Sequence, residues 1–431
     1  MTTQTKLKRI AWLSAMDKGK QFNCLLHHFN DESLAECFQQ LDGKKAVGTD
    51  GVTKACYGEK LNENIRELTE RMKRMAYRPK PVREVLIPKE GRPGAKRPLG
   101  ISNLEDKIVQ LMMQKVLESI YEPLFLDCSF GFRPGRGCHD AIRTLHQHLF
   151  REDVEIVIDV DLENYFGTID HEILEAILRE KIKDERFMRY IKRMFKAGVL
   201  SEGELKINDE GVPQGSICSP ILSNIFAHYV LDTWFEETVK RHCRGRVELF
   251  RYCDDAVICC QFESDAQRIV QALSKRLAKY RLKLNEEKTR LVSFSKSAYR
   301  QGIKQEGFDF LGFNFYLGRS HKGVTIPKLK SSGKRLRMKL QRINQWAREN
   351  RNKFRLMEIW RMVRVKLQGH IQYYGMSFNM RVVQRFLNTV RRILFKWFNR
   401  RSQRRSFTWE KFNLFIQANP LPRAKICHAL F

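Results

Sequence analysis

Tyr252-Cys253-Asp254-Asp255 separates two apolar runs, and it is the most informative tetrapeptide of the chain. Leu249-Phe250-Arg251-Tyr252 before it and Ala256-Val257-Ile258-Cys259-Cys260 after it have the composition of β-strands. We therefore expect a β-hairpin with both aspartates in its connection, outside the ladder of hydrogen bonds. Two neighbouring carboxylates repel each other unless a cation neutralises them, and Mg²⁺ prefers such hard oxygen ligands.

A third carboxylate, Asp161, ends the run Ile156-Val157-Ile158-Asp159-Val160-Asp161, which is typical of a buried strand. Two-metal phosphoryl transfer requires acids from separate strands to converge on two ions about 3.5–4 Å apart. In isolation, an Asp-Asp pair more often serves only the geometry of a turn. The Gly- and Pro-containing loop at residues 211–220 favours the metal-binding interpretation, because such a loop lets the backbone approach a ligand closely.

The chain resembles the bacterial group II intron reverse transcriptases, also called intron-encoded maturases, over nearly its whole length. The resemblance is carried by blocks in the order of the family, at residues 44–52, 77–89, 97–101, 129–136, 252–255, 284–289, 310–313 and 367–375. It implies an α+β right-hand polymerase, with fingers and a palm containing a small antiparallel sheet, followed by a helical thumb called domain X.

We expect four parts: an N-terminal helical extension at residues 1–43, fingers and palm at 44–315, the thumb at 316–405 and a tail at 406–431. In the extension, Leu25, Phe29, Leu34 and Phe38 are candidate core residues. Residues 328–366 contain 14 Lys and Arg but only two acids, and apolar residues recur there at helical spacing. The spacing predicts three basic amphipathic helices, with apolar stripes at 336–346, 356–367 and 383–397.

Composition favours a nucleic-acid partner, because 79 Lys and Arg against 49 Asp and Glu give a formal net charge of +30. An anionic membrane surface would attract the same charge. The mean hydropathy of −0.47 and the absence of an apolar run near ~18–20 residues argue against insertion into a membrane. The N-terminal residues do not form a secretory signal, and eleven cysteines without framework spacing fit a reducing compartment, so we expect a cytoplasmic protein.

The resemblance implies an RNA-directed DNA polymerase, a nucleotidyltransferase that extends a primer 3′-hydroxyl with dNTPs on an RNA or DNA template. Asp161, Asp254, Asp255 and Lys288 are the implied catalytic residues, with Lys288 as the proton donor to pyrophosphate. Asp161, Leu162, Asp254 and Asp255 form the implied metal site for two Mg²⁺ ions, which Mn²⁺ can replace.

The resemblance also implies a set of residues around the nucleotide and the primer. Lys89 and Arg97 would clamp the triphosphate, and Phe166 would exclude a 2′-hydroxyl. Surface solubility and ordinary core packing are the respective alternatives for these residues. The remaining implied substrate-binding residues are Pro213, Gln214 and Gly215 beside the templating pair and Tyr252 near the primer end.

Three functional interpretations stay open from the sequence. The chain is a reverse transcriptase of a mobile intron that also binds intron RNA as a splicing maturase, an RNA-binding maturase without polymerase activity, or a free-standing relative acting in DNA repair or phage defence. Cys253, where most intron-encoded members carry Ala, leaves the first and third interpretations open. A monomer and a dimer are both compatible with the sequence. The alternative for Cys253 is that it is only a small, buried, polarisable residue of the core.

Overall fold

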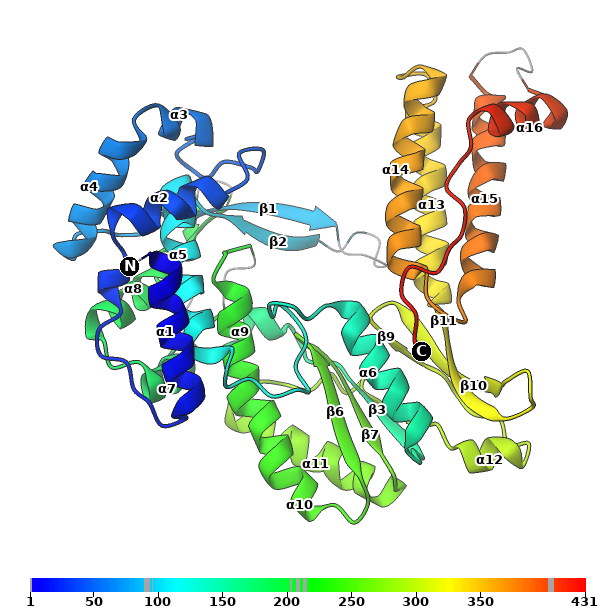
Figure 1. The fold of residues 1–431 in the computed structure, drawn as a ribbon, viewed down its shortest axis with the longest axis horizontal. Helices are drawn as coiled ribbons and strands as arrows, with labels where there is room; N and C mark the ends of the chain where they lie inside the picture. The colour runs from blue at the N-terminus through cyan, green and yellow to red at the C-terminus, as the bar shows by residue number, and fades with distance from the viewer. Residues whose placement is uncertain are drawn as a thin grey trace. The chain divides into compact units, whose positions relative to one another are not determined.

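The computed structural model describes residues 2–88, 94, 96–201, 204–206, 210–211, 215–401 and 407–431 (Figure 1). The chain forms two compact units. The first comprises Met1–Gly137, Val160–Ile258 and Ser264–Arg290, and the second comprises Cys138–Asp159, Cys259–Glu263 and Leu291–Phe431. This division follows spatial contacts and does not test the sequence-based boundaries at residues 43, 315 and 405, which stay predictions.

The first unit begins with helices, as predicted for the N-terminal extension. Leu25, Phe29, Leu34 and Phe38 are all buried, as expected. Asn30 caps the second helix: its side chain accepts a hydrogen bond from the Ser33 amide, and the Ser33 hydroxyl accepts one from the Asn30 amide. The helices of this part are α1 (Thr3–Met16), η1 (Leu26–His28), α2 (Asp31–Gln40), α3 (Lys54–Glu59), α4 (Leu61–Lys73) and α5 (Leu104–Tyr121).

A four-stranded sheet of the first unit has the order β2-β1-β4-β5. Strand β1 pairs antiparallel with β2 and parallel with β4, and β4 pairs antiparallel with β5. The register places Ile87 opposite Arg97, so Arg97 lies on the β1–β2 ribbon. The strands are β1 (Val82–Pro88), β2 (Lys96–Ile101), β4 (Val199–Ser201) and β5 (Glu204–Lys206).

A second four-stranded sheet has the order β6-β7-β3-β8 and contains the predicted hairpin. Asp255 is the first residue of β7, so only Cys253 and Asp254 form the connection, whereas the sequence predicted both aspartates there. Asp161 follows the end of β3 directly. The strands are β3 (Ile156–Val160), β6 (Val247–Tyr252), β7 (Asp255–Cys260) and β8 (Arg290–Ser293).

The remaining helical elements of this region include two π-helical segments, which sequence periodicity did not predict. One of them, η3, continues directly from α9. The elements are η2 (Tyr165–Gly167), α7 (His171–Lys181), α8 (Glu185–Phe195), α9 (Ser219–Ala227), η3 (His228–Asp232), η4 (Phe235–Val239), α10 (Lys240–His242) and α11 (Glu263–Lys279).

The second unit contains a three-stranded sheet and the predicted basic helices. Strands β9 and β10 are joined by Leu311 and Gly312, both with positive φ (48° and 85°), which gives a tight hairpin at residues 310–313. The strands are β9 (Phe308–Phe310), β10 (Phe313–Arg319) and β11 (Thr325–Ser331), in the order β11-β10-β9, with α6 (Cys138–Arg151) and α12 (Lys296–Arg300) in the same unit.

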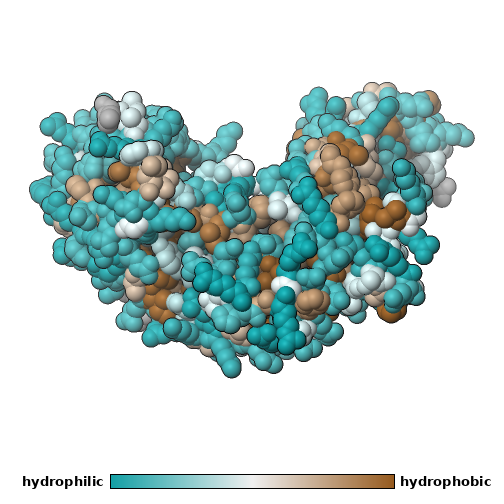
Figure 2. Space-filling view, turned by 60° about the horizontal axis from the view of Figure 1, so that its bottom comes forward, coloured by the Kyte–Doolittle hydropathy of each residue, from teal (hydrophilic) through white to brown (hydrophobic). Residues whose placement is uncertain are grey.

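Three long helices, α13 (Gly333–Asn350), α14 (Leu356–Tyr374) and α15 (Met380–Phe398), occur where the apolar spacing predicted them, and α16 (Trp409–Ala418) follows. The predicted stripes of α14 and α15 are largely buried, as at Trp360 and Phe386. On α13 only Ile343 of the predicted stripe is buried, and its other members, Leu336, Leu340 and Trp346, are half-buried. The face of the molecule in Figure 2 is mostly hydrophilic, with apolar residues in separate patches. Among the described residues, none of the helices combines the length and the apolar character that crossing a membrane requires.

Candidate active site

The ends of two neighbouring strands bring Asp161 and Asp254 together. Strands β3 and β7 are adjacent in their sheet, and the Glu155 amide, just before β3, donates to the Cys260 carbonyl at the end of β7 (3.0 Å). The two strands therefore run antiparallel, and the end of β3 lies beside the start of β7. Burial raises the pKa of Asp254 above its usual range, and the charge of Asp161 adds to that rise while Arg97 opposes it.

The segment at residues 284–289 is fixed against the end of β3. Leu162 forms an antiparallel bridge with Leu284, and the Asn285 amide donates to the Asp161 carbonyl at 2.9 Å. The Lys288 ammonium then donates to Asp161 Oδ2 at 2.6 Å, with both side chains partly exposed. Two blocks that are 127 residues apart in the chain thus meet at one carboxylate.

The donor chemistry of this corner fits a divalent cation. Asp161 and Asp254 offer hard carboxylate oxygens, and the raised pKa of Asp254 means that added positive charge would be favourable there. Asp255 is exposed. Within the described ranges, no group of three or more His, Cys, Asp or Glu side chains is arranged to hold a metal ion. The Asp161 carboxylate, which would bind such an ion, is paired with Lys288 in this structure.

On the finger side, Arg97 is exposed on β2 and lies within electrostatic reach of Asp254. Gly215, from the segment at residues 211–220, approaches the same strand. Gly215 has a φ of +110°, and a Cβ there would lie 2.4 Å from the Gly100 carbonyl oxygen, so only glycine fits. The other predicted residues of these two segments, Lys89, Pro213 and Gln214, fall outside the described residues.

The aromatic pair after Asp161 has one buried and one accessible member. Tyr165 is buried, and its hydroxyl donates to the Ser223 carbonyl at 2.6 Å. The Phe166 ring packs edge-on against Tyr165 with 5.6 Å between centroids, but Phe166 is only half-buried. Tyr252, the last residue of β6, is also half-buried. Anchored Tyr165 thus fixes the backbone that presents Phe166.

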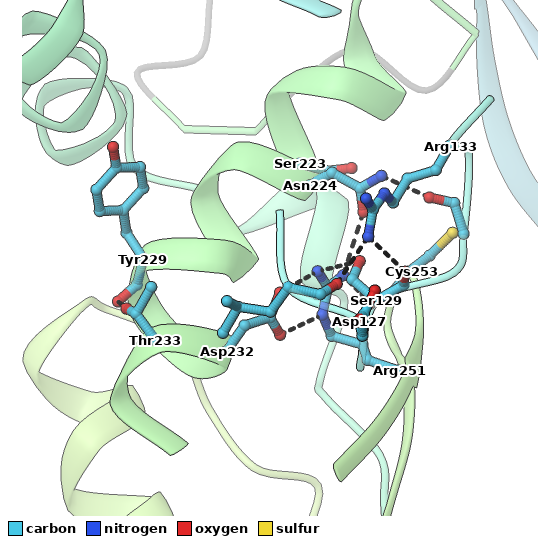
Figure 3. A network of polar contacts seen from close by, with 12 residues as sticks. Asp127, Ser129, Arg133, Ser223, Asn224, Tyr229, Asp232, Thr233, Arg251 and Cys253 are labelled. Carbon is cyan, nitrogen blue, oxygen red and sulfur yellow. Dashed lines mark hydrogen bonds and ion pairs between the residues drawn. The ribbon is translucent and has the colours of Figure 1, made fainter. Parts of the chain in front are cut away.

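A buried ionic network beside the hairpin is the part of the site that sequence reasoning missed (Figure 3). Arg251 and Asp232 have side-chain exposures of 1% and 0%, and they form a two-pronged ion pair with distances of 2.7 and 2.5 Å. The available signal was an arginine inside the otherwise apolar run 249–252, two residues before Cys253. Buried arginines require partners, but the sequence did not identify them.

Comparison with known proteins gives a consistent set of matches. A model of the family described as reverse transcriptase (RNA-dependent DNA polymerase) matches residues 87–315. Protein YkfC of Escherichia coli is 31% identical over 363 residues, which cover 75% of this chain and 92% of that protein. Group II intron-encoded protein LtrA of Lactococcus lactis is 36% identical over 191 residues, covering 44% of this chain and 31% of LtrA.

A yeast intron protein also matches about half of this chain. The putative COX1/OXI3 intron 2 protein of Saccharomyces cerevisiae is 33% identical over 236 residues, covering 53% of this chain and 26% of the yeast protein. The chain therefore spans nearly all of the Escherichia coli relative but less than a third of LtrA and of the yeast protein.

Proposed function

This chain belongs to the reverse transcriptase family and is a group II intron-like reverse transcriptase/maturase, and from that premise we propose that it is an RNA-directed DNA polymerase. It extends a primer 3′-hydroxyl with dNTPs on an RNA or DNA template. One observation carries the proposal: Asp161 and Asp254 interact at the ends of adjacent strands, and Lys288 binds Asp161.

In this proposal Asp161 and Asp254, assisted by Leu162 and Asp255, hold two Mg²⁺ ions or Mn²⁺ in their place. When bound, such ions activate the attacking 3′-oxygen and stabilise the leaving oxygen. Asp161 directly follows β3 and Asp254 directly precedes β7, so the pairing of these two strands sets the spacing of the carboxylates.

The other side chains bind and orient the substrates. Lys288 holds its proton at Nζ, 2.6 Å from Asp161, and donates it to the departing pyrophosphate. Arg97, together with Lys89, binds the triphosphate, for which a guanidinium fork is suited. The half-buried Phe166 ring excludes a 2′-hydroxyl by its volume.

The template and primer are bound by the remaining predicted residues. Gly215, with Pro213 and Gln214, lines the templating pair. Its tight approach to the Gly100 carbonyl supports a loop held against the finger strand. Tyr252 contacts the primer end, since it immediately precedes the turn that carries Asp254.

Primer extension on an RNA template with Mg²⁺ tests the proposal directly. Asp254→Asn removes the charge of an implied metal ligand. We expect at least about a 100-fold loss of extension, because mutating residues that only support metal ligands already costs about 10–100-fold in activity. Asp153→Asn is the matched control, since that carboxylate is 88% exposed and lies outside the site. Full extension by the Asp254→Asn protein would refute the polymerase assignment.

We propose a second activity, binding of structured group II intron RNA as a splicing maturase. It is supported by the basic helices of the thumb: Arg381, Arg385 and Arg392 line one groove of α15 together with Gln384, Asn388 and Thr389. Intron splicing assayed with the Asp254→Asn protein separates the two activities, because RNA binding does not use that carboxylate. Finding no intron RNA beside the coding sequence would favour the free-standing alternative in repair or phage defence.

A further inference from the structure

We propose that Arg251 is a positioning residue for the polymerase reaction, and that its buried guanidinium fixes the turn that carries Asp254. The inference rests on the proposed function, because it concerns the same carboxylates. Arg251 itself is 1% exposed and does not reach solvent or substrate. Any effect on catalysis must therefore pass through the groups that it holds.

The guanidinium connects the turn to two other parts of the first unit, the segment of Ser129 and the continuous helix formed by α9 and η3 (Figure 3). Nη1 donates to the Cys253 carbonyl, inside the turn, at 3.1 Å. Nη1 also donates to Asn224 Oδ1 at 3.1 Å, and Nη2 donates to Ser129 Oγ at 2.7 Å. With the ion pair to Asp232, these bonds use all the N–H donors of the guanidinium. A fully used planar fork leaves the side chain one orientation.

The Cys253 carbonyl is the acceptor that matters for the site. Cys253 has a φ of 59°, the left-handed region where glycine is favoured over a residue with a Cβ. Such a conformation persists only where surrounding contacts enforce it. The Cys253 carbonyl and the Asp254 nitrogen belong to the same planar peptide group. A hydrogen bond to that carbonyl therefore also orients the backbone nitrogen and Cα of Asp254.

The segment at residues 128–131, which lies beside Cys253, is bonded to the same residues. The Arg251 amide donates to the Cys128 carbonyl at 2.8 Å, and the Phe130 amide donates to the Arg251 carbonyl at 2.9 Å. Asn224 Nδ2 donates to the Gly131 carbonyl at 2.5 Å, so one amide side chain contacts both Arg251 and the segment beside Cys253. The segment at residues 128–131 is therefore bonded to the Arg251 backbone and, through Asn224, to the Arg251 guanidinium.

The π-helical segment η3 explains how one helix supplies both acidic and amide partners. Asn224 and Asp232 are eight residues apart, which on an ideal α-helix places them about 80° apart around the axis. A π turn has more residues per turn, so η3 rotates Asp232 back toward the face of Asn224. Segments of this kind occur frequently at functional sites, which agrees with a role for Asp232 in holding Arg251.

Arg251→Lys is the first test, because lysine keeps the positive charge for Asp232 but cannot reproduce the planar fork. We expect kcat for primer extension to fall by about 10–100-fold while KM for dNTP changes less than about threefold. Mn²⁺ binding to the protein without nucleic acid, followed by electron paramagnetic resonance, should weaken at least about fivefold. Ser129→Ala, which removes one acceptor only, should give smaller changes in the same direction.

Arg193→Lys provides the matched control. Arg193 Nη1 donates to the Met75 and Tyr77 carbonyls, both at 2.7 Å, and Met75 has a φ of 58°, so this arginine also holds a left-handed turn, remote from the site. It should lower the melting temperature without changing kcat or Mn²⁺ affinity. Unchanged kcat and Mn²⁺ affinity in Arg251→Lys, with only a lower melting temperature, would overturn the inference.

Two outcomes keep the inference separate from the proposed function. If the wild-type protein fails to extend primers, the polymerase proposal fails, whereas the Mn²⁺ affinities of wild type and Arg251→Lys still decide the positioning role. If Arg251→Lys does not fold, Ser129→Ala decides it: weaker Mn²⁺ binding supports the inference, and wild-type binding refutes it.

Discussion

At the scale of single residues, Gly131 lies so close to Cys253 that no larger residue fits at position 131 without a shift. A Cβ added to Gly131 would lie 2.4 Å from Cys253 Sγ and 2.6 Å from the Cys253 nitrogen. The nitrogen belongs to the backbone of the turn that carries Asp254 and cannot swing aside as a side chain can. Gly131 thus allows the turn to hold a residue larger than the alanine usual in the family.

Gly131→Ala should displace the turn and reduce primer extension at least about tenfold, because a misplacement near 1 Å can cost about 100-fold. Gly43→Ala is the control, since a Cβ there meets only the Lys54 side chain at 3.5 Å or more. Extension rates and melting temperatures of the two variants give the comparison. Unimpaired extension by Gly131→Ala would show that the close contact is relieved without moving Asp254.

The double variant Gly131→Ala with Cys253→Ala separates the two contacts. Removing Sγ relieves the 2.4 Å contact but leaves the 2.6 Å contact with the nitrogen. We therefore expect partial recovery of extension relative to Gly131→Ala alone. Cys253→Ala by itself should lower the melting temperature slightly, because Cys253 is a small side chain that is only 6% exposed.

At the scale of elements, local periodicity and long-range pairing differ in what the sequence reveals. The helices α13, α14 and α15 were predicted from apolar residues such as Ile343, Val363 and Val390, because a helix forms its pattern within a few residues. The partners of Arg251 were not predicted, since Asp232 and Ser129 lie 19 and 122 residues away. Their approach depends on strand pairing and on a π segment, and neither has a local signal.

Besides Arg251, the protein has another buried polar side chain that the sequence did not distinguish from the apolar core residues. It is His370, on α14. His370 is fully buried, neither ring nitrogen has a hydrogen-bond partner among the described residues, and its ring stacks on Phe386 with 3.8 Å between centroids. Burial lowers the pKa of His370 from 6.5 to about 3, and the charge of Lys339 adds to that effect. The folded protein therefore keeps this ring neutral where an unfolded chain would protonate it.

The pH dependence follows from that difference. Between pH 6.5 and about 3 the unfolded state binds a proton at His370 that the folded state does not bind. The free energy of unfolding therefore does not depend on His370 above pH 6.5 and falls as the pH decreases below it. The slope is at most about 1.4 kcal/mol per pH unit for one group. His370→Leu should be more stable at pH 5 and have a smaller melting-temperature difference between pH 7 and pH 5 than wild type.

Comparing the variant with wild type cancels the contributions of the other titrating groups. His146→Leu is a useful reference, because His146 is also buried with a lowered pKa but has one nitrogen hydrogen-bonded to the Pro327 carbonyl at 3.1 Å. That variant loses a hydrogen bond and should gain less at low pH. Equal pH dependence in wild type and His370→Leu would mean that the histidine is not neutral in the folded protein.

At the scale of the whole molecule, charge is the property that the sequence predicted most directly. Net charge needs no knowledge of the fold, so +30 already indicated an anionic partner. The sequence could not say which cations face that partner. The structure narrows the choice in the second unit, where Arg381, Arg385 and Arg392 share one groove on α15.

Nucleic-acid binding should therefore weaken steeply with salt, with a logarithmic slope of about −0.9 for each phosphate neutralised on duplex DNA and about −0.7 on single strands. Each of Arg381→Gln, Arg385→Gln and Arg392→Gln should reduce the magnitude of that slope by about one. Arg66→Gln on α4 is the control, since its side chain is 78% exposed and pairs only loosely with Glu70 at 3.8 Å. Fluorescence anisotropy of a labelled RNA–DNA duplex between 50 and 300 mM salt, roughly the range over which counterion release is measured, gives each slope. If the three α15 variants keep the wild-type slope and only Arg66→Gln changes it, the duplex is bound by the first unit, and the basic groove of α15 has another anionic partner or none.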